Sequence, residues 1–469
     1  DELPWLDNVG IFNHTKQNNR KIMKFQAKLF LITLVIPALL TIGCKKNDDG
    51  DNEDPNNNQL PALYRAIMTD KLVDADYWQE EPAILAAGLG FTDINGIPDL
   101  GASGQTLEQT KALVRLHGGG WHNIISSAPE DEIPLRARTS GASVFQITES
   151  FGYSSPLGDG LPMELSHPVL ASTVEREDIL IYLNTGETVV PSNISVMPNM
   201  EFNERSTLVM NGNFGNRINP DEDGAIYPVK FEIVGNLLLV TPSGLIDATG
   251  LTFGDGTAPL TAYRTGAGPR LCAAKLTHAQ AGLAGEGAPT TIQDDSFPND
   301  LVSLYGDNAQ YRLRVLTTGG FSPDGVRSMY PSEFERYFRV GVAPEGVAAD
   351  DYENLLWLIK TDTEYVLQGY GKLIVHGLAE LGQLRGDYDD SYLEDHDNQI
   401  DIVLSGDEEA AARIVVVYIP AEHPYSPFYN PGGPGSIPDP NTTYSEPGPT
   451  YYQPVTVALD DPMQVSFEL

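Results

Sequence analysis

The densest group of possible metal ligands in the sequence lies between residues 387 and 401. The stretch DYDDSYLEDHDNQID carries seven carboxylates in 15 residues. Ca²⁺ takes about six to eight oxygen ligands from carboxylates, carbonyls and water, and one short acidic loop can supply many of them. The pattern therefore predicts a calcium site whose ligands come from five aspartates: Asp387, Asp389, Asp390, Asp395 and Asp397.

The alternative interpretation of this stretch is a solvated acidic turn between two strands. The central glycine and the flanking helices of an EF-hand are absent, so the stretch lacks the standard framework for calcium. A weaker candidate, NPDEDG at residues 219–224, lies in an Asn- and Gly-rich stretch and is more typical of a simple turn.

Histidine and cysteine spacing does not indicate a zinc site. The eight histidines show no H-x-H, H-x-x-x-H or H-E-x-x-H pattern, and no C-x-x-C pair occurs. Cys272 lies in the apolar segment RLCAA, where a buried, inert thiol is expected rather than a nucleophile.

One glycine-rich motif could support acyl-transfer chemistry. HGGGW at residues 117–121 resembles the oxyanion-hole loop of lipase and esterase α/β-hydrolases, whose backbone N–H groups stabilise a developing negative charge. That family also needs a G-x-S-x-G turn, and none occurs in this sequence. The alternative is a helix end followed by a glycine turn, with Trp121 covering the edge of the core.

An uncharged run near the start of the chain indicates export. Leu29–Ile42 contains about 14 residues, fewer than the roughly 20 that span a bilayer, and it follows Lys24 and Lys28. This arrangement is typical of the apolar centre of a signal peptide behind a short basic region.

The end of this run resembles the lipobox of bacterial lipoproteins. Gly43 precedes Cys44, and the resemblance implies cleavage between them and acylation of the Cys44 thiol. Because the first methionine is Met23, residues 1–22 are expected to be upstream sequence and residues 23–43 the signal peptide. A plain signal peptide with an incidental cysteine, or an uncleaved anchor, is the alternative.

The residues after the cysteine suggest where the protein resides. KKNDD at residues 45–49 resembles the export signal of surface-exposed lipoproteins in the Bacteroidota, which implies an outer-membrane protein facing the exterior. Residues 44–59 are rich in acids, Asn, Gly and Pro and have nothing to bury, so a solvated tether is expected.

Composition restricts the possible partners. The chain has 65 acidic and 29 basic residues and a net charge of −36. A nucleic-acid partner is not expected, because such binding needs a basic surface. An acidic surface suits a secreted protein and can collect divalent cations.

The pattern of apolar residues predicts a mainly β protein with a small helical N-terminal region, α+β overall, built from antiparallel, sandwich-like domains. Glycine and proline are frequent, and long helical periodicity is scarce. The predicted division is a helical region at 60–131, a β-rich domain at 132–260, and a β-rich domain at 300–469 with a Pro/Gly-rich loop at 424–450. The boundary between the β-rich domains is expected between residues 255 and 300.

Individual elements follow from local signals. Helices are predicted at residues 61–68, from a capping box at residues 106–109, and at residues 332–338. Hairpins are predicted for 178–183 with 187–190 and for 229–233 with 237–240, and further strands for 311–315, 414–419 and 463–469.

Two functions remain open at this point. The first is a non-catalytic surface lipoprotein acting as a binding or structural module, with calcium as a possible stabilising ion. The second is a surface hydrolase for polysaccharide or ester substrates. Paired carboxylates for glycoside hydrolysis cannot be located among 65 acidic residues by sequence alone.

Overall fold

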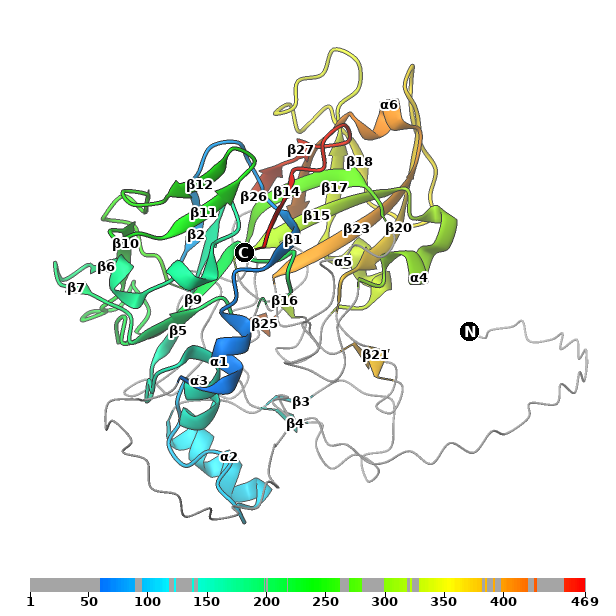
Figure 1. The fold of residues 1–469 in the computed structure, drawn as a ribbon. Coiled ribbons are helices and arrows are strands. Elements are labelled where there is room, and N and C mark those ends of the chain that lie inside the picture. The colour runs from blue at the N-terminus through cyan, green and yellow to red at the C-terminus, as the bar shows by residue number, and fades with distance from the viewer. Residues whose placement is uncertain are drawn as a thin grey trace, which may run out of the picture. The chain divides into compact units, whose positions relative to one another are not determined.

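The computed structural model describes residues 60–88, 95–117, 122–123, 137–138, 142–197, 199, 201–216, 218–261, 270–280, 299–318, 321–322, 329–381, 384–385, 391–392, 398–420, 426–427 and 451–468. The chain divides into two units, Asp1–Asn47 and Asp48–Leu469, and all described residues belong to the second. The described part is mainly β, with several antiparallel sheets and few helices, so the predicted fold class is confirmed (Figure 1). The predicted signal peptide, Cys44 and the tether lie outside the described residues.

Two antiparallel sheets share a core formed by residues between Ile84 and Leu260. One sheet has the order β2 (Ile84–Ala87), β5 (Asp159–Leu165), β9 (Thr207–Gly212), β8 (Asn193–Ser195), and the other has the order β13 (Thr252–Phe253), β10 (Pro228–Ile233), β6 (Ile179–Leu183), β7 (Thr188–Val189). Met163, Ile181 and Phe231 from these strands are fully buried in this core.

A second core lies between a six-stranded and a four-stranded sheet. The larger sheet has the order β19 (Tyr365–Leu367), β20 (Gly371–Ala379), β23 (Gln399–Gly406), β15 (Tyr311–Thr317), β14 (Leu271–His278), β27 (Thr456–Val457), and the smaller has the order β18 (Leu356–Leu358), β17 (Arg339–Val342), β24 (Ile414–Ile419), β26 (Tyr451–Pro454). Leu313, Ile402 and Val417 pack in this core. The apolar run at 414–419 is a central strand, as predicted.

Short strand pairs complete the β structure of the described residues. They are β1 (Leu72–Asp76) with β28 (Gln464–Phe467), β11 (Leu238–Thr241) with β12 (Gly244–Asp247), β3 (His122–Asn123) with β4 (Ala137–Arg138), β16 (Phe321–Ser322) with β25 (Ser426–Pro427), and β21 (Leu384–Arg385) with β22 (Ser391–Tyr392). The predicted C-terminal strand is confirmed by β28. Within the predicted loop at 424–450, β25 is a short strand, a departure from the prediction.

The described helices are short. They are α1 (Ala62–Ile67), α2 (Leu107–Leu116), α3 (Val144–Phe151), α4 (Leu301–Tyr305), α5 (Phe334–Tyr337) and α6 (Glu408–Ala411), with 3-10 turns η1 (Ala171–Thr173), η2 (Arg176–Asp178), η3 (Gly306–Asn308) and η4 (Pro331–Glu333). The predicted capping box is confirmed, because Thr106 and Gln109 exchange hydrogen bonds at the start of α2. None of the helices in the described ranges is both long and apolar enough to cross a membrane.

Two sequence predictions need correction. The region predicted as helical, 60–131, also contains β1 and β2, which pair with the distant strands β28 and β5. The predicted hairpin of 229–233 with 237–240 does not form, although both segments are strands. β10 pairs with β6 and β13, and β11 pairs with β12.

Local hydrogen bonds explain why that hairpin does not form. The amide of Val234 donates to the Asp178 carbonyl at 2.7 Å, and the amide of Ile233 donates to the Leu251 carbonyl at 3.0 Å. These bonds attach the end of β10 to Asp178 and Leu251 and not to β11. The next turn is instead formed at Thr241, whose hydroxyl donates to the Gly244 carbonyl at 2.8 Å.

Candidate functional site

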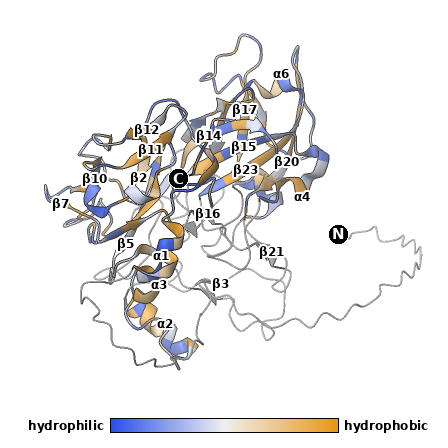
Figure 2. Ribbon diagram, viewed as in Figure 1, coloured by the Kyte–Doolittle hydropathy of each residue, from blue (hydrophilic) through white to orange (hydrophobic). Residues whose placement is uncertain are grey.

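Three charged residues lie in register across the six-stranded sheet. Lys275 on β14 is opposite Arg314 on β15, which is opposite Asp401 on β23. Successive side chains of a strand point to opposite faces, so Arg314 lies on the face away from Leu313 and Val315. Because every residue of β15 is buried, this row of charges faces the interior. Figure 2 shows apolar and polar residues mixed along the strands of this sheet.

Arg314 is the centre of a group of buried ion pairs. Its Nε is 2.7 Å from Asp401 Oδ1, its Nη1 is 2.9 Å from Glu204 Oε1, and its Nη2 is 2.9 Å from Glu380 Oε2. Asp76 Oδ2 lies 3.3 Å from Nη1. The planar guanidinium has five donors in a fixed fork, so one arginine can hold carboxylates from several segments.

Lys275 extends the same group toward β1 and β28. Its Nζ lies 2.7 Å from Asp76 Oδ1 and donates to the carbonyls of Tyr77 and Met463 at 3.2 and 2.9 Å. Burial lowers the pKa of Lys275 to about 8, although Asp76 opposes the shift. Burial alone would raise the pKa of Asp76, but Lys275 and the neighbouring arginines hold it well below its usual range.

Together these residues form what we call the charged network, which consists of Asp76, Glu204, Lys275, Arg314, Glu380 and Asp401. No member is more than 3% exposed. A lysine with a pKa near 8 can act as a nucleophile in other proteins. Here the three N–H donors of the ammonium group are matched by three acceptors, so the lysine is held as a structural cation.

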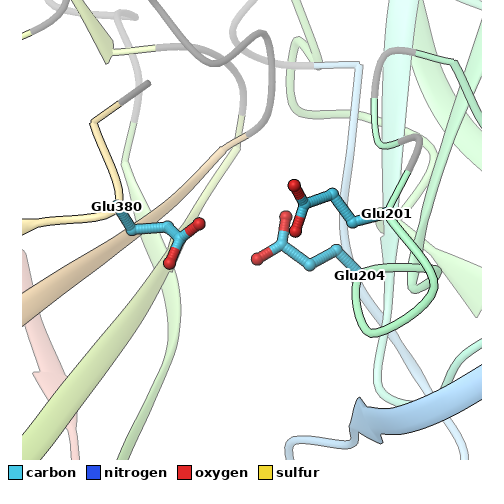
Figure 3. Close-up of side chains that lie close together, drawn as sticks. All are labelled: Glu201, Glu204 and Glu380. Atoms are coloured by element: carbon cyan, nitrogen blue, oxygen red, sulfur yellow. The ribbon is translucent and has the colours of Figure 1, made fainter. Parts of the chain in front are cut away.

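Three buried glutamates meet at one side of this network. Figure 3 shows Glu201 and Glu204 pointing toward Glu380 from a different segment. Ligand oxygens of all three lie within 4.8 Å of one another, a spacing at which carboxylates could hold a metal ion. Arg314 already contacts Glu204 and Glu380, so ion pairing accounts for the approach of these two carboxylates.

A polar seam connects the two sets of sheets beside the charged network. The Thr207 hydroxyl on β9 donates to Glu164 Oε2 and lies 3.3 Å from the Asn398 side-chain oxygen. The side chain of Asn199 donates to the same Asn398 oxygen at 3.1 Å. Burial raises the pKa of Glu164 to about 8, against the lowering effect of its hydrogen bonds. This carboxyl group is therefore mainly protonated at neutral pH.

The sequence-predicted calcium ligands are not tested by these contacts. Asp387, Asp389, Asp390, Asp395 and Asp397 all lie outside the described residues. Asp401 ends the same acidic stretch, and it is buried against Arg314. That aspartate therefore does not belong to a solvated turn.

The weaker candidate at residues 219–224 forms a turn, as the sequence predicts. The amide of Asp221 donates to the Asn219 side chain at 3.0 Å, and the amide of Glu222 donates to the Asn219 carbonyl at 2.8 Å. These bonds are those of an Asx-type turn.

Two sequence candidates remain, and the structure describes His117 of the first and Cys272, the second. His117 ends α2, as the helix-end interpretation predicts, and residues 118–121 lie outside the described ranges. The Cys272 thiol on β14 donates to the Leu316 carbonyl at 3.4 Å. Burial raises the pKa of this thiol, so it is a poor nucleophile, as expected.

Sequence reasoning missed the charged network. The alternation at 311–315 predicts a strand in which Arg312 and Arg314 alternate with apolar residues, and this pattern does not by itself indicate buried charges. A useful signal was present in the single lysine of RLCAAKLTH, since Lys275 is the only formal charge between Leu271 and Thr277. A lone charge inside an apolar strand indicates a buried partner.

No protein-family model, curated protein or solved structure matches this chain. Its function is therefore inferred from its own residues.

Proposed function

We propose that this chain is a cell-surface lipoprotein, held in the outer membrane by lipid on Cys44 and facing the exterior. Its β-rich body would act as a binding or structural module for an extracellular ligand. The main support for the lipid anchor is the uncharged run Leu29–Ile42, which is followed by Gly43 and Cys44 and then by an acidic segment.

The charged network supports the structural part of this proposal. Arg314 and Lys275 join segments that lie far apart in the sequence, including segments near both ends of the described chain, at Asp76 and Met463. Breaking one partner of a buried ion pair typically costs about 3–5 kcal/mol. Buried ion pairs between distant segments stabilise the β-rich part of the chain, which suits a module that must stay folded outside the cell.

The anchor is tested by replacing Cys44 with alanine and fractionating the expressing cells. We expect the wild type to take up labelled palmitate and to sediment with the outer membrane, and the variant to do neither. Surface exposure is checked by digestion of intact cells with a protease.

Cys272→Ala is the matched control, because it removes the other cysteine of the chain. It should leave palmitate uptake unchanged. Membrane association of the Cys44→Ala variant, together with an unlabelled wild type, would contradict the proposal.

Calcium is a further part of the proposed function. Five closely spaced aspartates repel one another without a cation, and a bound Ca²⁺ would turn that repulsion into attraction. The support for this is the acidic sequence from residue 387 to 397.

A further inference from the structure

A histidine and a serine contact each other on the neighbouring antiparallel strands β20 and β23. His376 Nε2 lies 2.7 Å from Ser405 Oγ. The register of this strand pair shifts between Val375 and Gly377, so His376 is the extra residue of a β-bulge. Bulges turn the side chain that they carry away from the regular direction and are frequent beside active sites.

The other imidazole nitrogen contacts a carboxylate. His376 Nδ1 lies 3.0 Å from Asp362 Oδ1. Asp362 has a φ of 49°, in the left-handed region that residues other than glycine seldom adopt. Its amide donates to the Val375 carbonyl at 2.8 Å, which fixes this turn against β20. Backbone strain of this kind concentrates at functional sites.

The three side chains form one hydrogen-bonded chain. Both contacts fall in the range of about 2.6–3.2 Å that joins a nucleophile, its base and the group that orients the base. In the tautomer that carries its proton on Nδ1, His376 donates to Asp362, and its Nε2 accepts from the Ser405 hydroxyl. A carboxylate beside Nδ1 favours this tautomer, in which the imidazole can take the serine proton.

We propose that Ser405, His376 and Asp362 form a hydrolytic site for carboxylic esters. Ser405 is the nucleophile, His376 the general base, and Asp362 the positioning residue. The Asp362 side chain is 77% exposed and that of His376 is 8% exposed, and Ser405 as a whole residue is 8% exposed, so the chain of hydrogen bonds begins at the protein surface. This activity goes beyond the proposed surface role and does not depend on the lipid anchor.

The substrate class follows from the nucleophile. Ser405 Oγ forms a bond to the ester carbonyl carbon while His376 Nε2 takes the serine proton. The ester C–O bond then breaks, and the alcohol leaves with that proton. Water, deprotonated by His376, attacks the acyl-serine and releases the carboxylic acid and free Ser405. Glycosidic bonds, in contrast, are usually cleaved by paired carboxylates, which this site lacks among the described residues.

The test uses the purified full-length chain, a fluorophosphonate probe and p-nitrophenyl acetate. We expect the probe to label Ser405, as located by peptide mass spectrometry, and Ser405→Ala to remove the label and the ester hydrolysis. His376→Asn should lower the rate by roughly 10²–10⁴-fold. Asp362→Asn should lower kcat with little change in KM, and Asp362→Glu should restore part of it.

His278→Asn is the matched control. His278 is another partly exposed histidine near a carboxylate, with its Nε2 3.7 Å from Glu408 Oε2. This variant should keep both labelling and hydrolysis. A folded wild type that leaves Ser405 unlabelled, or hydrolysis by Ser405→Ala at the wild-type rate, would overturn the proposal. Labelling of the wild type needs no variant, so it remains decisive if a substitution impairs folding.

Discussion

At the scale of single residues, Glu164 shows how the interior changes the chemistry of a side chain. It is fully buried on β5, and Thr207 donates to one of its two oxygens. The other oxygen has no hydrogen-bond partner among the described residues. A neutral carboxylic acid suits this environment, because an ionised carboxylate would lose its hydration without sufficient compensation.

This environment predicts a pH-dependent stability. The pKa of Glu164 is about 8 in the folded chain, against an ordinary value of 4.5. The folded state therefore binds more protons between these values, and its stability falls as pH rises from about 4.5 to about 8, by at most about 1.4 kcal/mol per pH unit. Glu164→Gln should remove this component, as measured by urea unfolding at pH 5 and pH 9.

Many other groups titrate over this range, so the difference between wild type and variant is the informative quantity. Glu353→Gln, at an exposed position, is the control and should follow the wild type at both pH values. Parallel pH profiles for the wild type and Glu164→Gln would show that Glu164 is not buried as a neutral acid.

At the scale of elements, β15 has two kinds of buried face. Leu313 and Val315 pack into the apolar core, while Arg314 on the other face contacts carboxylates from four other segments. The strand is therefore held both by apolar burial and by charge pairing. Loss of the charge pairing should weaken the contacts of β15 with β23 and with the end of β20.

Arg314→Met tests the contribution of this face. The substitution leaves several buried carboxylates without their shared cation, and we expect the free energy of unfolding to fall by about 3–5 kcal/mol. Chemical denaturation monitored by circular dichroism provides the measurement. Lys372→Met is the control, because the side chains of the Lys372–Glu364 pair are each 51% exposed, and it should cost less than about 1 kcal/mol. Equal effects of the two substitutions would contradict a special role for Arg314.

At the scale of the whole molecule, the excess of acidic residues is the dominant electrostatic property. The net charge of −36 disfavours the compact state through self-repulsion. Cations reduce this cost either by general screening or by binding at a defined site. The two mechanisms differ in their dependence on the identity of the cation.

Calcium binding at the predicted aspartates should raise the melting temperature. At a calcium concentration of about 100 times its dissociation constant, binding adds roughly 2.7 kcal/mol of stability. Thermal melts of the full-length chain in EDTA and in millimolar CaCl₂, at matched ionic strength, measure the effect. Magnesium should substitute poorly, because it demands near-octahedral geometry.

The double variant Asp395→Asn with Asp397→Asn separates binding from screening. It should lose most of the calcium-dependent shift and keep the response to salt. Coincident melts in calcium and EDTA, or a shift that survives in the double variant, would support the solvated-turn interpretation instead.

Sequence alone determined the features that depend on nearby residues. The alternation from Tyr311 onward predicted β15, the apolar run from Ile414 predicted the central strand β24, and Thr106 with Gln109 predicted the start of α2. Each of these signals arises from side-chain periodicity or from hydrogen bonds within one turn, so it is visible in a short window of sequence.

Only the tertiary structure decided which strands pair and which charges are buried. Arg314 and Glu204 are 110 positions apart, and Arg314 and Asp76 are 238 apart. No local pattern connects such positions, because their contact depends on how whole sheets pack. The same reason explains why β10 was correctly predicted as a strand but wrongly paired, because its partner β6 lies far away along the chain and the energy of pairing comes from neighbours across the sheet. The other strand of the predicted hairpin, β11, pairs instead with β12, which directly follows it in the sequence.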